Sequence, residues 1–434
     1  MARPCNRDTV APSHAPIVLP TRRREHPVLA VISTFPPTRC GLATYADDLI
    51  HALCAAEPQL GILRVRVVPR EDDDGGSAVL VVRRSPIDTW ATAAGWLSEH
   101  SVDVALIQHE FKVFGGRYGC NILRLMEQHP CSFVVTLHTV SRRLRGPRLD
   151  TLRRVCDASD RIIVHLPESK EVLQRFGVEG AKIHVIPHGI PIIPFDEPKA
   201  ASGPCPNMRP LFLSFGHLRR SKGYELAISA LARLRDDGIP FEYWIYGKNH
   251  PRPRTCESYR ASLVALIQEV ALEDRVRFVD AYLGAEELVR IVKTCDLGIL
   301  PYTRTEQASS GTLAFFLACG RPVVASAFRA AQQTVDEGCG RLFPVGSVDS
   351  LYNALKQVTS AASLRKKMML HAREKAQAWG WDIVGRQYLN VISTISRSTQ
   401  YRGPSSYSHK RPEVPSTAEQ TFHGNGSRQT KSVR

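Results

Sequence analysis

The sequence predicts an α/β protein built from two doubly wound domains that face each other across a cleft. The prediction rests on the chain length of 434 residues, on strand and helix patterns that alternate in two separate runs, and on a proline-rich break between the runs. A chain of this length is too long for one ordinary core, so two domains are expected. Strands that alternate with helices form parallel sheets with helices on both faces.

The first run predicts a domain over residues 27–190. It starts with a strand at 28–33, a continuous apolar stretch of the kind found in buried parallel strands. A helix is expected over 42–55, where apolar residues recur at helical spacing. The alternation continues with strands at 63–68, 102–108, 132–137, 161–165 and 182–186, and with helices that include 122–128 and 168–176.

Frequent prolines and a loss of periodicity mark residues 191–210, which we interpret as the linker between the domains. The alternation then restarts, with strands at 211–215, 241–246, 275–279, 297–300 and 322–326 and helices at 223–235, 258–271, 286–294 and up to about 319. Helices without strands follow at 349–356, 361–378 and 381–395. We expect a second domain over 211–380, a closing helix over 381–397, and disordered tails at 1–26 and 398–434.

Composition excludes several classes of protein. Hydrophobic residues make up 43% of the chain and charged residues 23%, which excludes a mainly disordered or fibrous protein. No run approaches the roughly 20 apolar residues of a membrane helix, and the N-terminal segment has no signal-peptide core, so a cytoplasmic protein is expected. The 11 cysteines include no CxxC pair, which favours free thiols over disulfides or a zinc site.

The net charge of +15 is concentrated on the tails. Residues 1–26 carry +3, from five arginines against two acidic residues, and residues 397–434 carry +5, from seven lysines and arginines against two acidic residues. A basic surface attracts nucleic acid, anionic lipid or nucleotide phosphates, and composition does not choose among them.

The turn at 301–313 is the most informative segment, because it joins an apolar strand to an apolar helix. The first turn of a helix has unpaired N–H groups and a partial positive charge, so it attracts anions. Small or hydroxylated residues at this point let a phosphate approach the backbone and add donors: Ser309, Ser310, Gly311 and Thr312. Glu306 is expected to point into the cleft. The alternative interpretation is an N-cap with an incidental carboxylate.

A second strand-to-helix corner ends at Lys222 and carries several cations. Gly216 and His217 follow the strand, and Lys222 lies at the junction with the helix, where it could neutralise a diphosphate leaving group. We interpret Arg219 and Arg220 as solvated.

Polar residues also follow the strands of the first domain. Gly41 lies at the first strand-to-helix corner, although one glycine is a weak phosphate signal. His109, Glu110, His138 and His188 each come at or just after a strand end, so one rim of the sheet could form a polar binding site. Hydrogen-bonded structural histidines are the alternative. The spacing matches no zinc-ligand pattern, so no metal site is expected.

Together these segments resemble the retaining family-4 glycosyltransferases of GT-B fold over about residues 28–395. The resemblance rests on the order and spacing of residues 32–37 with Gly41, 185–189, Phe215-Gly216 with Lys222-Gly223, 306–311, and 318–325. It implies two Rossmann-like domains and a closing helix that crosses back onto the first domain.

The resemblance also implies roles for individual residues. In that family the lysine that matches Lys222 holds the donor diphosphate, and the helix start that matches Ser310–Thr312 cradles phosphate through its amides. The glutamate that matches Glu306 contacts the transferred sugar, and a histidine like His138 lies near that sugar and the acceptor. Such enzymes usually need no metal, so we expect no cofactor beyond the nucleotide-sugar substrate.

The chain departs from the family pattern at three positions. A second glutamate, eight residues after the first, commonly contacts the ribose, and Ala314 stands there. The arginine often found after the glycine of the second corner is His217, and the first glycine of the N-terminal pair is Cys40.

We therefore predict an enzyme that transfers a hexose from a nucleotide-diphosphate sugar to a carbohydrate or lipid-linked acceptor, with retention of anomeric configuration. The expected partners are donor and acceptor, with peripheral contact at the inner face of an anionic membrane; nucleic acid is not expected. One alternative, motivated by Ala314 and His217, is a catalytically divergent protein that binds nucleic acid or a membrane surface. Another is a related GT-B epimerase or phosphorylase. Templates for P-loop, zinc-protease and serine-hydrolase chemistry are absent from the sequence.

Overall fold

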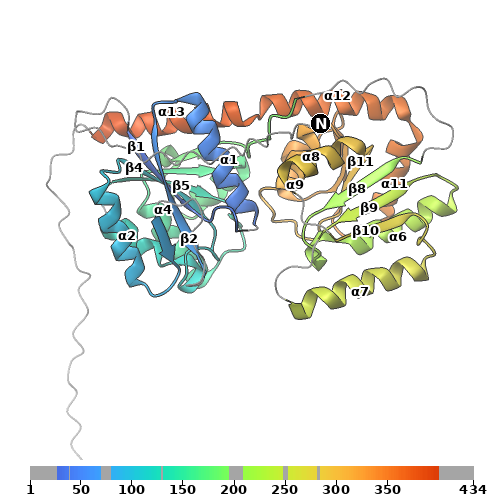
Figure 1. Ribbon diagram of the computed structural model, residues 1–434, viewed down its shortest axis with the longest axis horizontal. Coiled ribbons are helices and arrows are strands. Elements are labelled where there is room, and N and C mark those ends of the chain that lie inside the picture. The colour runs from blue at the N-terminus through green and yellow to red at the C-terminus, as the bar shows by residue number, and fades with distance from the viewer. Residues whose placement is uncertain are drawn as a thin grey trace, which may run out of the picture.

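The computed structural model describes residues 27–399 apart from 39, 70–79, 129–130, 195–208, 248–252 and 281–283. It consists of two α/β domains side by side, with a pair of successive helices running along both (Figure 1). The N-terminal tail, residues 400–434 of the predicted C-terminal tail and most of the predicted linker lie outside the described residues.

The first domain contains a parallel seven-stranded sheet in the order β3-β2-β1-β4-β5-β6-β7. Its strands are β1 (Val28–Ser33), β2 (Gly61–Val68), β3 (Leu80–Arg83), β4 (Val104–His109), β5 (Ser132–Leu137), β6 (Arg161–Val164) and β7 (Ile183–Val185). Its helices are α1 (Gly41–Ala56), α2 (Asp88–Glu99), α3 (Ile122–Gln128), α4 (Gly146–Asp157) and α5 (Pro167–Arg175). Every residue of β1 and β4 is buried, as their unbroken apolar runs predict.

The second domain contains a parallel six-stranded sheet in the order β10-β9-β8-β11-β12-β13. Its strands are β8 (Leu211–Phe215), β9 (Glu242–Tyr246), β10 (Val276–Val279), β11 (Leu297–Leu300), β12 (Val323–Ser326) and β13 (Gly340–Phe343). Its helices are α6 (Tyr224–Asp236), α7 (Pro253–Glu269), α8 (Ala285–Thr294), α9 (Gly311–Ala318), α10 (Arg329–Thr334) and α11 (Val348–Ser360).

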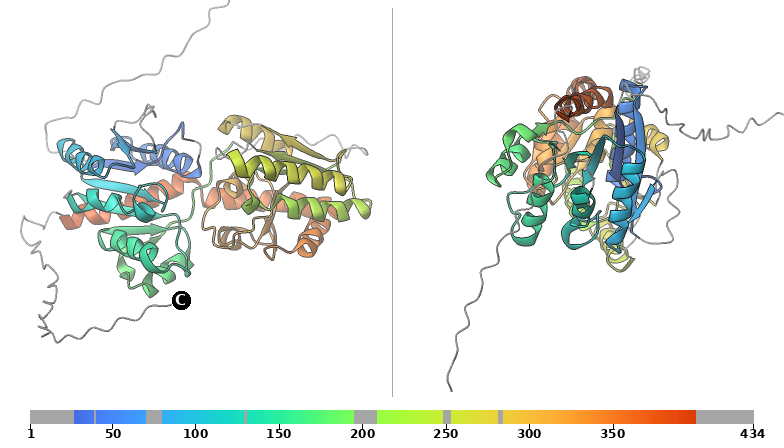
Figure 2. Two further views of the ribbon diagram at one scale, coloured as in Figure 1. Left: turned by 90° about the horizontal axis from the view of Figure 1, so that it is seen from below. Right: turned by 90° about the vertical axis from the view of Figure 1, so that its left-hand side faces the viewer.

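The last two helices connect the domains. Helix α12 (Ala362–Ala378) packs on the core of the second domain, and α13 (Trp381–Thr399) lies along the first (Figures 1 and 2). The Tyr388 hydroxyl of α13 is hydrogen bonded to the buried hydroxyls of Tyr45 (2.9 Å) and Thr136 (2.8 Å). A Cβ atom at Gly189 would lie 2.4 Å from the Trp381 ring, so glycine there lets the chain after β7 pass close to α13. The predicted crossing helix is therefore present.

The fold class predicted from the sequence is confirmed, and the differences are local. Strands β3 and β13 and helix α10 were not predicted. Each is short, from four to six residues, and both strands lie at a sheet edge, where one partly exposed face removes the continuous apolar run.

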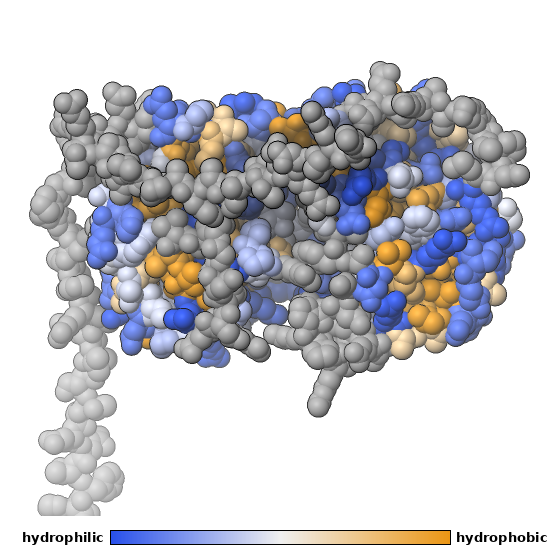
Figure 3. All heavy atoms as spheres, viewed as in Figure 1, coloured by the Kyte–Doolittle hydropathy of each residue, from blue (hydrophilic) through white to orange (hydrophobic). Residues whose placement is uncertain are grey.

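Apolar side chains fill the two domain cores, and the described surface is mixed. Figure 3 shows hydrophilic residues over much of the outline of both domains, with smaller hydrophobic patches between them. The most exposed large hydrophobic residues, Ile192, Leu370 and Ile87, are scattered along the sequence. Within the described ranges, no helix is both long and apolar enough to cross a bilayer.

Candidate functional site

The corner between β8 and α6 brings Lys222 next to the loop that follows β11. Gly216 (φ 127°) and Gly223 (φ 66°) have positive φ angles, which glycine adopts without strain. A Cβ atom at Gly223 would lie 2.0 Å from the carbonyl oxygen of Pro301, so this close approach of two backbones requires glycine. Lys222 ends the intervening 3₁₀ turn, and its side chain passes close to Gly216.

Tyr302 forms the floor under the Lys222 ammonium group. The Lys222 Nζ atom lies 3.8 Å from the centre of the Tyr302 ring, which stacks on Phe328 at 4.8 Å. Burial opposes ionisation of the Tyr302 hydroxyl, but the Lys222 charge and the nearby Thr312 and Ser310 hydroxyls outweigh it and lower the pKa of Tyr302. Tyr302 was not predicted as a site residue.

The N-terminus of α9 lies beside this pair. Ser310 is the N-cap, and its Oγ accepts a hydrogen bond from Leu313 N at 3.2 Å. Gly311 is exposed, and a Cβ atom there would meet nothing within 4 Å, so there is open space beside the first residue of the helix. Ser309 and Thr312 are half-buried on either side. One ammonium group and one helix N-terminus thus converge at the same point, an arrangement suited to an anion.

The β8–α6 corner carries three further basic residues besides Lys222. His217 is half-buried beside Gly216. Arg219 and Arg220 are exposed, and the Arg220 guanidinium lies 5.4 Å from the Tyr259 ring centre. Lys222 is therefore the cation of this corner that the structure places against the α9 start.

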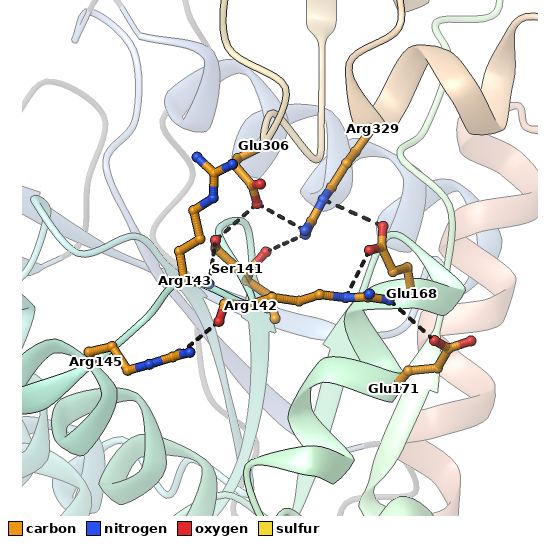
Figure 4. Close-up of polar contacts among 9 residues, drawn as sticks. Ser141, Arg142, Arg143, Arg145, Glu168, Glu171, Glu306 and Arg329 are labelled. Atoms are coloured by element: carbon orange, nitrogen blue, oxygen red, sulfur yellow. Dashed lines mark hydrogen bonds and ion pairs between the residues drawn. The ribbon is translucent and has the colours of Figure 1, made fainter.

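Glu306 lies at the boundary between the two domains (Figure 4). Its Oε2 accepts a hydrogen bond from Ser141 Oγ of the first domain at 2.9 Å. The same oxygen lies 2.9 Å from Nη2 of Arg329, the first residue of α10. Neither Ser141 nor Arg329 was predicted, because the first carries no distinctive motif and α10 itself was not predicted.

The N-terminal corner and the β4 end are held by local contacts. Gly41 is the first residue of α1, and a Cβ atom there would meet nothing within 4 Å. Cys40, its N-cap, contacts Thr34 Oγ1 through sulfur at 3.3 Å. At the end of β4, Glu110 Oε2 accepts a hydrogen bond from Thr139 Oγ1 at 2.6 Å, which joins the β4 and β5 ends. His109 is buried and stacks on the Phe114 ring, with the ring centres 5.7 Å apart.

Three histidines gather around Tyr45 at the ends of β5, β6 and β7. The centre of the Tyr45 ring lies 4.7 Å from His138, 5.3 Å from His165 and 5.0 Å from His188. The His138 Nε2 atom hydrogen bonds to Gln108 Oε1 at 2.9 Å, and the other two rings bond to main-chain carbonyls. Of the predicted histidines, the structure therefore brings His138 and His188 together through His165. His109 is the neighbour of His138 across the sheet, and its carbonyl accepts a hydrogen bond from the His138 amide at 3.2 Å.

Burial lowers the pKa of all these histidines. It lowers the pKa of His165 to about 3 and that of His109 to about 4, and it lowers those of His138 and His188 as well. The rings are therefore neutral at pH 7. The unfolded chain, with pKa values near 6.5, binds these protons more readily, so the stabilisation present above pH 6.5 is lost as the pH falls toward 4 and 3.

We expect His165 and His109 together to lower the free energy of unfolding by about 4 kcal/mol between pH 7.5 and pH 5, because pH 5 lies about 1.5 units below the unfolded pKa and each unit costs about 1.4 kcal/mol per histidine. Urea denaturation at the two pH values measures this fall. Because acid also protonates carboxylates, the informative comparison is with His109→Asn, which should lose less stability on acidification than wild type. Equal losses in the two proteins would contradict the assignment.

A small pocket lies between the domains, behind the start of α9. His165 and His188 line it from the first domain, and Ser310, Ala314 and Gln333 line it from the second. Ala314, which stands where the family pattern has its second glutamate, thus lines this pocket. Within the described residues, no group of three His, Cys, Asp or Glu side chains is placed to hold a metal ion.

Two family models match the chain, one in each domain. Residues 40–192 match the model described as Glycosyltransferase Family 4, and residues 209–361 match the model described as Glycosyl transferases group 1. A D-inositol 3-phosphate glycosyltransferase of Kribbella flavida is 25% identical over 254 residues, 56% of this chain and 59% of that protein. A putative colanic acid biosynthesis glycosyltransferase, WcaL of Salmonella typhimurium, is 26% identical over 230 residues, 51% of this chain and 54% of that protein. The matches thus span less than two thirds of these relatives.

Solved structures share the two-domain architecture. A sucrose-phosphate synthase from Thermosynechococcus elongatus superposes with a TM-score of 0.68 at 20% identity, covering 86% of this chain and 100% of that one. A glycosyltransferase from Rickettsia africae gives 0.69 at 14% identity with the same coverage. Anabaena HepE, solved in complex with UDP and glucose, gives 0.66 at 16% identity, covering 85% and 100%. At these identities the likeness establishes the fold.

Proposed function

The chain belongs to the family-4 glycosyltransferases of GT-B fold, and from that premise we propose that it transfers a hexose from a nucleotide-diphosphate sugar to a carbohydrate or lipid-linked acceptor with retention of configuration. The observation that carries the proposal is the convergence of Lys222 with the N-terminus of α9 at the cleft. The UDP-bound state of the structurally similar HepE supports a nucleotide donor.

The diphosphate leaving group fits this convergence. Breaking the bond between the anomeric carbon and the phosphate oxygen concentrates negative charge on that oxygen, and Lys222 with the amides of residues 311 and 312 can stabilise it. The residues are held in place before the donor arrives, by the Gly223–Pro301 contact and by the Ser310 cap. We assign no protein residue as general base, because the departing phosphate can itself accept the acceptor proton.

Glu306 is proposed to orient the donor sugar through its hydroxyl groups, with His138 on the opposite side of the cleft. Its place at the boundary between the domains supports this role, since a sugar attached to a phosphate at α9 lies between the two sheets. That the reaction uses no metal, and that the basic surface meets an anionic membrane, stay predictions.

The acceptor is proposed to carry a phosphate group. Arg143, Arg145 and Arg148 follow Ser141 closely, and in the part of the chain that the structure describes none of the three is within ion-pair distance of a carboxylate. Arg143 is linked to Glu306 through Ser141, because the Arg143 amide donates to Ser141 Oγ at 3.2 Å and that hydroxyl donates to Glu306 (Figure 4). Guanidinium groups suit phosphate oxygens, and several relatives are named for an inositol phosphate.

The alternative of a non-catalytic protein that binds nucleic acid or a membrane surface is not favoured. Both family models and the relatives are named as glycosyltransferases. Ala314 and His217, which motivated that alternative, leave Lys222 and Glu306 in the cleft.

Turnover of a donor panel tests the proposal. Purified full-length protein is incubated with UDP-glucose, UDP-galactose, ADP-glucose or GDP-mannose, with sugar phosphates or the matching free sugars as acceptors. We expect one donor to release nucleoside diphosphate in an acceptor-dependent way, faster with the phosphorylated acceptor, and the product to retain the donor's anomeric configuration by NMR. The proposal would be contradicted if no donor bound or reacted, or if the release of nucleoside diphosphate did not depend on the acceptor.

A further inference from the structure

Arg329 is one of two buried arginines in the described part of the chain, with a side chain 9% exposed. Each nitrogen of its guanidinium group has a partner. Nη2 lies 2.9 Å from Glu306 Oε2, Nη1 donates to the Val140 carbonyl at 3.0 Å, and Nε lies 3.4 Å from Glu168 Oε2. A planar guanidinium with all its sides engaged holds its partners at fixed angles.

The partners of Arg329 come from both domains. Glu306 belongs to the second domain, whereas Val140 follows β5 and Glu168 lies in α5 of the first (Figure 4). Ser141, next to Val140, donates to the same Glu306 oxygen that Arg329 contacts. The guanidinium therefore spans the boundary between the domains, and its full set of contacts exists only when the domains are together.

The backbone ties Arg329 firmly to Glu306. The amide of Arg329 donates to the Thr305 carbonyl at 3.0 Å, and the amide of Ala330 donates to the Gln307 carbonyl at 3.0 Å. The start of α10 and the loop that carries Glu306 thus form one hydrogen-bonded unit. When the first domain approaches this unit, Val140 and Glu168 fix the guanidinium, and the guanidinium in turn fixes the carboxylate.

We propose that Arg329 is a positioning residue that couples closure of the two domains to the orientation of Glu306 toward the donor sugar. The proposal rests on the proposed function and adds a dependence on the first domain to the sugar contact of the second. Domain closure around a bound donor excludes water from the reaction. Because Glu306 is held in its orientation only after closure, it does not orient the sugar for reaction while the cleft is open to water.

Three variants test the proposal, with UDP and UDP-glucose as probes or, where the donor panel favours it, GDP and GDP-mannose. Removing one partner of a buried charged pair typically has a large effect, so Arg329→Gln should lower kcat at least about thirtyfold. The Kd for the nucleoside diphosphate should change less than about threefold, because the diphosphate contacts Lys222 and α9. Arg329→Lys, which keeps the charge, should recover part of the loss, and Glu168→Gln should lower kcat about three- to tenfold.

Arg154→Gln is the matched control. The Arg154 and Glu127 side chains of the first domain also form an ion pair at 2.9 Å, but both are more than half exposed. This variant should keep the wild-type kcat, since exposed pairs contribute little. Circular dichroism melts identify any Arg329→Gln protein that fails to fold, in which case Arg329→Lys and Glu168→Gln carry the test.

Several outcomes separate the two proposals. If wild type turns over the donor but Arg329→Gln matches Arg154→Gln in kcat, or loses diphosphate affinity as much as kcat, Arg329 does not act by positioning Glu306. Wild-type kcat in Glu168→Gln would contradict the coupling to closure. If wild type neither binds the nucleoside diphosphates nor turns over their sugars, the proposed function fails and this proposal fails with it.

Discussion

Replacing Lys222 by alanine should lower kcat/KM for sugar transfer about 100-fold, the size of loss seen when one group that stabilises transition-state charge is removed. The Lys222 ammonium group is held over Tyr302 beside the α9 N-terminus, so no conformational search is needed when the diphosphate departs. Because the diphosphate is present before and after the reaction, the affinity for free nucleoside diphosphate should fall as well.

Steady-state kinetics and calorimetry on matched variants check this expectation. Lys222→Arg keeps the charge but changes its reach, so an intermediate loss is expected. Arg219→Ala removes an exposed cation from the same corner and should stay near wild type. If Lys222→Ala and Arg219→Ala both stay within about threefold of wild type, the diphosphate is not bound at Lys222.

Replacing Glu306 by glutamine should lower kcat about 100-fold. Unlike Lys222→Ala, this variant should keep its affinity for nucleoside diphosphate. The variant keeps the shape of the side chain but removes its negative charge. That charge lies next to Arg329, on the oxygen that accepts a hydrogen bond from Ser141 Oγ. The variant should bind free nucleoside diphosphate as wild type does, because the proposed role of Glu306 is to contact the sugar rather than the phosphates. Measured kcat with the active donor, and the Kd of its nucleoside diphosphate, separate this variant from Lys222→Ala.

The control for Glu306 is Glu337→Gln, an exposed carboxylate of the same domain that should keep wild-type activity. A Glu306→Gln enzyme with near-normal kcat would remove Glu306 from the mechanism. A parallel loss of diphosphate affinity would instead assign it to the phosphate site.

Most of the fold follows from local sequence patterns, because buried parallel strands leave continuous apolar runs. The strands at 132–137, 211–215 and 297–300 have the predicted bounds in the structure. The elements that were not predicted lack a continuous apolar run. Strand β13 (Gly340–Phe343) is four residues long with an exposed Leu342, and α10 is too short for helical periodicity to be visible.

The candidate site divides in the same way. Lys222, Glu306 and Ser310 lie in turns between a strand and a helix of one domain, so their chemistry and position could be inferred from nearby residues. Arg329 and Ser141 matter because of how the two domains meet, and Arg329 contacts a carbonyl 189 residues away in the chain. Tyr302 could not be predicted for the same reason, although its partner is nearer in the sequence. Its contact with Lys222 depends on the close approach of two loops.

The most direct test is a crystal structure of the full-length protein with a nucleotide sugar that it turns over. The account predicts that the diphosphate lies within hydrogen-bond distance of Lys222 Nζ and of the amides at the start of α9, with the sugar ring against Glu306. A diphosphate bound elsewhere, or this crevice left unoccupied at saturating donor, would contradict it.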